Sequence, residues 1–133
     1  MIVFLDTNVV IYAVELHAAF GLKAQSRIAL ALAAGDTLMA SDLVRMECLV
    51  GPLKLAKPAL EKAFRNFLAP SNVQVVGITA AVCDRAASIR ATFNFKSLDA
   101  LQLAAALEHG ANVFLTSDAR LNSYTGLTVE VLK

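Results

Sequence analysis

The chain has 133 residues, a length that suits one domain, so we expect residues 1–133 to form a single domain. Hydrophobic residues make up 57% and charged residues 17%, which excludes intrinsic disorder because such a chain can bury a core. The net charge of +1 gives no general indication of nucleic-acid binding. Because no membrane-length apolar run and no basic leader segment are evident, we expect a cytoplasmic protein without membrane association.

Short apolar runs alternate with segments of helical periodicity along the chain. The run at 2–5 predicts a strand buried on both faces, and Gly51-Pro52 predicts the end of the third helix. Predicted strands cover 2–5, 37–40, 73–76, 113–115 and 128–132, and predicted helices cover 8–15, 23–34, 41–50, 57–68, 79–93 and 98–109. This alternation predicts an α/β sandwich with a mainly parallel central sheet.

The cysteines and histidines give no indication of a metal site. Cys48 and Cys83 lie far apart, each in a predicted helix, and His17 and His109 are isolated. We therefore expect both thiols to be buried and structural.

Two acidic residues directly follow predicted strands. Asp6 comes after the strand at 2–5, and Asp118 comes shortly after the strand at 113–115. Parallel sheets bind ligands at the carboxyl ends of their strands, which makes both residues candidates for a functional site. The alternative is that each one only caps the helix or turn that follows it.

Glu47 lies on what the periodicity predicts to be a buried helix face. It shares a stripe with Leu43 and Val50. A buried carboxylate is costly unless it is paired, hydrogen-bonded or bound to a metal. A buried salt bridge with an arginine is the structural alternative to a functional role.

Asp99 repeats this pattern in the last predicted helix, where it aligns with Leu103 and Ala106. The alternative is that Asp99 only interacts favourably with the N-terminus of a helix that Ser97 caps. That alternative accounts for an exposed aspartate but not for one on the apolar stripe.

The four carboxylates, taken together, predict a cation site. Like charges share a site only with raised pKa values or a compensating cation. Oxygen ligands without Cys or His suit Mg²⁺ or Mn²⁺, and such sites promote phosphoryl or phosphodiester chemistry.

Four segments carry a family resemblance: VFLDTNVVIY, ASDLVRMECLVG, SLDALQLAAALEHGA and VFLTSDARL. In this order they resemble the motifs of PIN-domain ribonucleases, and most of all the VapC-type toxins of bacterial type II toxin–antitoxin pairs. The resemblance implies a three-layer α/β/α sandwich and a metal-dependent endoribonuclease that uses Mg²⁺ or Mn²⁺. It also implies an RNA substrate, a cognate antitoxin and a homodimer.

The resemblance also implies roles for individual residues. Those implied to be catalytic and metal-binding are Asp6, Glu47, Asp99 and Asp118, with Asn8 and Thr116 in support. A weaker expectation concerns basic residues that could contact RNA phosphates or simply form a solvated helix face: Lys54, Lys57, Lys62 and Arg65. Core packing is the favoured interpretation of three aromatic residues that could also stack on bases: Tyr12, Phe93 and Phe95.

Other functions stay open at this point. The chain could be a PIN-domain nuclease of housekeeping RNA processing, or a non-catalytic PIN-like module that binds RNA or protein. A haloacid-dehalogenase-type phosphatase is disfavoured, because that family needs a second aspartate where this chain has Asn8.

Overall fold

A computed structural model describes residues 1–133, and at its centre lies a five-stranded sheet. Its strands are β1 (Ile2–Leu5), β2 (Thr37–Ser41), β3 (Gln74–Val76), β4 (Val113–Thr116) and β5 (Thr128–Val131). They lie in the order β3-β2-β1-β4-β5, and all four neighbouring pairs are parallel. This confirms the predicted parallel sheet.

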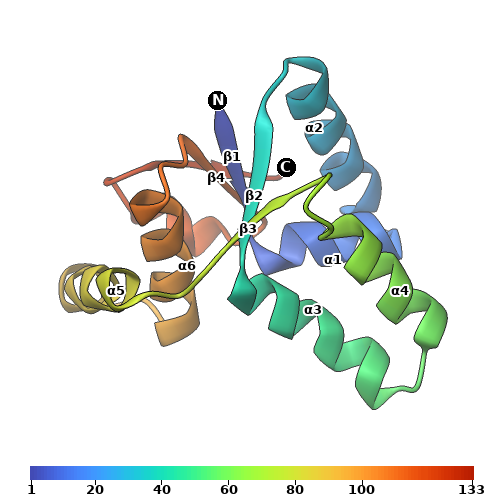
Figure 1. The fold of residues 1–133 in the computed structure, drawn as a ribbon. Helices are drawn as coiled ribbons and strands as arrows, with labels where there is room; N and C mark the ends of the chain where they lie inside the picture. The colour runs from blue at the N-terminus through green and yellow to red at the C-terminus, as the bar shows by residue number, and fades with distance from the viewer.

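Helices cover both faces of the sheet. They are α1 (Thr7–Glu15), α2 (Gly21–Ala33), α3 (Asp42–Lys54), α4 (Pro58–Phe67), α5 (Ala80–Phe93) and α6 (Ser97–Glu108), with a 3₁₀ helix η1 (Ala119–Ser123). Figure 1 shows α1 to α4 on one side of the sheet and α5 with α6 on the other. The predicted three-layer α/β/α sandwich is therefore confirmed.

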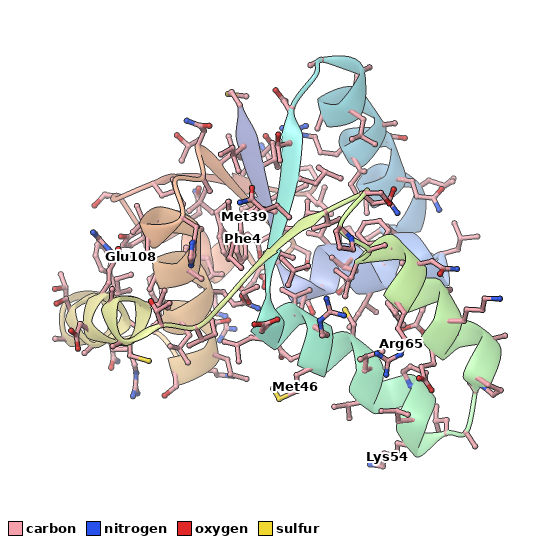
Figure 2. All side chains as sticks on the ribbon, viewed as in Figure 1. Phe4, Met39, Met46, Lys54, Arg65 and Glu108 are labelled. Carbon is pink, nitrogen blue, oxygen red and sulfur yellow. The ribbon has the colours of Figure 1, made fainter.

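The alternation of side chains along β1 divides the core in two. Val3 and Leu5 belong to the cluster under α1 to α4. Phe4 points to the opposite face, where its ring stacks on Phe114 with the centroids 5.3 Å apart. Met39 of β2 lies in the same cluster, beside Phe4 (Figure 2). Because both faces are covered, the central strand β1 is apolar throughout.

The strand order places a topological switch next to β1. The chain runs from β1 to β2 and β3 on one side, and then crosses to β4 and β5 on the other. In open parallel sheets, ligands bind at the carboxyl ends of the strands that flank such a switch, here β1 and β4. The backbone N–H of Asp6 donates to the carbonyl of Leu115 at 2.9 Å, so Asp6 lies at this point.

The prediction that Gly51-Pro52 ends a helix was wrong. Helix α3 continues to Lys54, with Pro52 buried inside it. An interior proline lacks an N–H and crowds the carbonyl one turn earlier, but the helix continues past Pro52, and the N–H of Leu55 donates to the carbonyl of Gly51 at 3.0 Å.

The predicted buried face of α3 was also misplaced. Val44, Cys48 and Leu49 are buried, whereas Met46 and Val50 are half exposed. In Figure 2 Met46 points away from the sheet. Glu47 consequently lies at the edge of the buried face rather than in its middle.

Two local predictions fail in α5 and α6. Cys48 is buried as expected, but Cys83 is exposed on α5. Ser97 does not cap α6, because it is the first helical residue, and the N-cap Lys96 makes no side-chain capping bond. None of the helices has the length and apolar character needed to cross a membrane.

Candidate active site

Asp6 is the most buried acid of the structure, with 7% of its surface exposed. Its Oδ1 accepts a hydrogen bond from the backbone N–H of Thr7 at 2.8 Å. Its Oδ2 accepts one from the hydroxyl of Thr116 at 2.7 Å. Asp6 is also the N-cap of α1, so the capping alternative is realised together with the placement at the switch point.

The surroundings of Asp6 disfavour its negative charge. Burial raises the pKa of Asp6 from 3.8 to about 6, against the opposing effect of the hydrogen bonds from Thr116 and Thr7. The carboxylates of Asp99 and Glu47 raise this pKa further. No basic side chain pairs with Asp6, so its charge lacks a counterion. The site therefore favours a proton or a cation at this position.

Glu47 is held by a hydroxyl group and not by an arginine. The Thr7 hydroxyl donates to Oε1 of Glu47 at 2.8 Å. Glu47 takes part in none of the salt bridges, which removes the salt-bridge alternative. Helix α3 thus presents a partly exposed carboxylate toward the start of α1.

A buried polar chain that the sequence reasoning missed supports this contact. The Ser41 hydroxyl donates to Oε1 of Gln102 at 2.6 Å, and Nε2 of Gln102 donates to the Thr7 hydroxyl at 3.3 Å. The signals were present in the sequence, because Ser41 ends a strand and Gln102 interrupts an apolar helix. This series of hydrogen bonds links β2, α6 and α1, and it fixes the side chain of Thr7, which in turn binds Glu47.

Asp99 lies in the first turn of α6 and is half-buried. Burial raises its pKa most, followed by the charge of Asp118, and Glu47 adds a smaller effect. Arg120 and Lys96 partly offset these contributions. Asp99 therefore shares its electrostatic surroundings with the other three predicted acids.

Asp118 differs from the other acids because it has a counterion. Arg120 donates to both of its oxygens, from Nε to Oδ1 at 3.0 Å and from Nη2 to Oδ2 at 2.5 Å. These bonds hold the pKa of Asp118 below its usual range. Asp118 also caps η1, as the alternative interpretation expected.

Thr116 connects two of the acids. Its hydroxyl donates to Asp6 and accepts a bond from the backbone N–H of Asp118 at 3.0 Å. It therefore fixes the orientation of the Asp6 carboxylate relative to the end of β4.

The structure gathers the four acids in one region without closing a cation site around them. No group of three or more Asp, Glu, His or Cys side chains is arranged to hold a metal ion. Thr7 engages Glu47, and Arg120 engages Asp118. A shared cation site requires these side chains to turn toward Asp6.

Asn8 is exposed on α1, and the neighbouring Thr7 makes the polar contact to an acid instead. The four basic residues Lys54, Lys57, Lys62 and Arg65 are all exposed; Lys54 ends α3, Lys57 is the N-cap of α4, and the other two lie on α4. Lys54 lies at the C-terminal end of α3 (Figure 2). Arg65 forms a salt bridge with Glu61 at 2.9 Å. None of the four forms a salt bridge with Asp6, Glu47, Asp99 or Asp118.

Comparisons with known proteins agree on the fold. The model of the PIN domain family matches residues 3–127. A chain of VapBC2 from Rickettsia felis bound to a promoter DNA fragment is 20% identical, with a TM-score of 0.84 and full coverage of both chains. A chain of DNA-bound VapBC from Salmonella typhimurium is 19% identical, with a TM-score of 0.80, covering 100% of this chain and 99% of that one.

A toxin–antitoxin complex from Klebsiella pneumoniae contains a third similar chain. It is 23% identical, with a TM-score of 0.72, and 98% of each chain is covered. No curated protein matches the sequence.

Proposed function

The chain belongs to the PIN domain family, and from this premise we propose that it is a VapC-type endoribonuclease, the toxin of a toxin–antitoxin pair, that depends on Mg²⁺ or Mn²⁺. The observation that carries the proposal is the surroundings of Asp6. This carboxylate is buried at a topological switch point, has no counterion, and lies in the field of Glu47 and Asp99. Such an arrangement costs stability unless a cation offsets it.

The donor set fits a hard divalent cation. Asp6, Glu47 and Asp99 supply oxygen atoms alone, which suits Mg²⁺ or Mn²⁺. In this proposal Asp6 and Asp99 would hold the ion, and Glu47, whose Oε1 accepts a hydrogen bond from Thr7, would be a third ligand. A bound divalent cation supplies an activated water and stabilises negative charge on a phosphodiester.

The protein residues supply orientation and charge. The hydroxyl of Thr116 donates to Oδ2 of Asp6 and thereby fixes the orientation of the carboxylate and of its remaining lone pairs. Gln102 and Ser41 hold Thr7, which sets the distance between α1 and α3. Asp118 keeps its charge through Arg120 and acts as an orienting group.

The charge distribution agrees with an RNA substrate. Setting aside the four candidate acids leaves 12 basic residues against seven acidic ones. The near-neutral total therefore averages an acidic region with a moderately basic remainder. Positive charge outside the acidic region favours a phosphate backbone.

Exposed apolar side chains support the proposed protein partners. Leu22, Leu30 and Leu32 are exposed on α2, and Met46 and Val50 are exposed on α3. Two apolar faces of this kind suit contact with a cognate antitoxin and with a second copy of the chain. Sedimentation of the chain alone and with the product of an adjacent small gene tests both contacts.

Two other functions are distinguished by experiment. A housekeeping PIN nuclease would cut RNA but have no antitoxin gene nearby, and a non-catalytic module would bind RNA or protein without cutting. The four retained acids favour a catalytic protein over such a module.

The test uses antitoxin-free protein stripped of metal and mixed with total RNA. With added Mg²⁺ or Mn²⁺ the wild-type protein is expected to produce discrete fragments. Asp6→Asn, Glu47→Gln and Asp99→Asn are expected to reduce cleavage to background with the fold retained. Asp84→Asn, at an exposed position of α5, is the control for loss of one charge. Cleavage unchanged in the three variants contradicts the proposed site.

A further inference from the structure

A cavity of about 370 Å³ adjoins the acidic region on the side of α5 and α6. Phe95, Lys96, Asp99 and Arg120 are among the residues that line it. Its size falls in the range of about 300–1,000 Å³ that is usual for pockets binding small ligands. Because Asp99 forms part of its wall, the cavity is continuous with the candidate active site.

We propose that this cavity binds one unpaired ribonucleotide of the RNA, next to the bond that is cut. The base lies against Phe95, and the phosphate is held by Lys96, Arg120 and the first backbone N–H groups of α6. This inference rests on the proposed function, and it assigns the recognition of unpaired RNA to this pocket rather than to the basic residues of α3 and α4.

The amino end of α6 provides an anion site. The N-cap Lys96 makes no side-chain capping bond, so the first N–H groups of the helix are left for an incoming acceptor. The N-terminus of a helix attracts anions through these groups and through its dipole. Lys96 and Arg120 both line the cavity and add positive charge to it. Arg120 binds Asp118 through Nε and Nη2, which leaves Nη1 for a phosphate.

The aromatic wall is fixed before any ligand arrives. The ring of Phe95 stacks on Phe93 with centroids 5.6 Å apart and planes 6° apart, and Tyr124 meets it edge-on. Nε of Arg90 donates to the carbonyl of Phe95 at 3.0 Å. Asn94 ends α5 in the left-handed conformation, with φ of 58°, which makes the turn short. A rigid aromatic ring loses little conformational freedom when a base stacks on it.

An anion site beside an aromatic ring selects a nucleotide over simpler anions. A free phosphate would use the helix end and the two cations but not Phe95. A base in a duplex has both faces covered by stacking, so an unpaired nucleotide fits best. Core packing of Phe95 is confirmed, because its ring packs on Phe93 and against the core under α5 and α6, and the same residue also lines the cavity.

The test measures nucleotide binding without catalysis. Backbone amide signals of the ¹⁵N-labelled protein in EDTA are followed while 5′-AMP, 5′-GMP, 5′-CMP or 5′-UMP is added, with ribose 5-phosphate as the phosphate-only probe. We expect shifts to concentrate at residues 94–99 and 119–123. At least one nucleotide should bind roughly fivefold or more tightly than ribose 5-phosphate, because stacking adds to the phosphate contact.

Matched variants separate the two contacts. Phe95→Leu is expected to reduce nucleotide affinity roughly fivefold or more and leave ribose 5-phosphate unchanged, whereas Lys96→Gln weakens both probes. The controls are Phe20→Leu and Lys23→Gln, an aromatic–cation pair at α2 with Lys23 5.5 Å from the ring. Melting temperatures identify any loss of fold, and Lys96→Gln at its exposed position tests the pocket even if Phe95→Leu unfolds.

The outcomes distinguish this inference from the proposed function. Nucleotide shifts at the pocket without any RNA cleavage support the pocket and contradict the nuclease. Cleavage with unchanged positions and rates in Phe95→Leu and Lys96→Gln supports the nuclease and overturns the pocket. Shifts that are absent, or that gather at α3 and α4, also overturn it.

Discussion

Replacing Asp6 with asparagine should stabilise the metal-free protein above neutral pH. The pKa of Asp6 is raised from 3.8 to about 6, so the folded state favours the protonated carboxyl. That favourable contribution is complete below pH 3.8 and is lost as the pH rises through about 6. Through this one group, the difference between the two pKa values makes the folded protein about 3 kcal/mol less stable at pH 8 than at a pH well below 3.8, where the carboxyl is protonated in both the folded and the unfolded state.

Asparagine removes this cost but also changes the hydrogen bonds. The carboxylate accepts bonds from Thr7 and Thr116, and the single amide oxygen of asparagine can replace only one of its two acceptors. The unpaired donor costs about 1–2 kcal/mol. At pH 8 Asp6→Asn should therefore be more stable by about 1–2 kcal/mol, or roughly 3–8 °C in melting temperature for a domain of this size.

The assay is thermal or urea unfolding of both proteins in EDTA from pH 4 to pH 8. Relative to the wild type, the variant should gain about 2.5 kcal/mol between pH 4 and pH 8, because about 0.5 kcal/mol of the loss in the wild type has already occurred at pH 4. Asp84→Asn serves as the exposed control. Excess Mn²⁺ should reverse the order, because an ion that binds only the folded wild type stabilises it. A variant that is less stable than the wild type by the same amount at every pH refutes the reasoning.

Three further predictions concern the groups around Asp6. Thr116→Val removes the hydroxyl that lowers the pKa of Asp6, so it should cost about 1–2 kcal/mol at pH 8 and less at pH 5 in urea unfolding. Gln102→Leu should cost about 1–3 kcal/mol, because the buried Ser41 hydroxyl loses its acceptor, and additional replacement of Ser41 by alanine should recover part of that loss. A thiol reagent should modify Cys83 rapidly in the native protein and spare Cys48, whose burial raises its pKa to about 12; equal rates would contradict this difference in burial.

The acids at strand ends could be predicted because their signal lies in a few consecutive residues of the sequence. An apolar run followed directly by Asp6 indicates a buried strand that delivers a carboxylate to the sheet edge. The sequence alone did not reveal the strand order, so the contact between Asp6 and Thr116 could not be derived from local pattern. Such contacts depend on tertiary packing across many residues.

The errors in α3 have a definite cause. Apolar residues lie on two faces of this helix, one buried through Val44 and Cys48 and one exposed through Met46 and Val50. Periodicity locates an apolar stripe but does not choose between two of them. The hydrogen bond between Thr7 and Glu47 escaped prediction because it needs the packing of α1 against α3.

The contact between Thr116 and Asp6 spans 110 residues of sequence. Strand β1 precedes the other four strands in the chain and is the central strand of the sheet, so during synthesis it stays without one of its two neighbours until β4 emerges. Pairing over so long a separation is slow compared with local helix formation. A nascent chain that ends before β4 lacks Thr116 and Asp118 altogether, so the acidic region is complete only after β4 has been made. For a protein proposed to cut RNA, this order of assembly withholds activity from the unfinished chain.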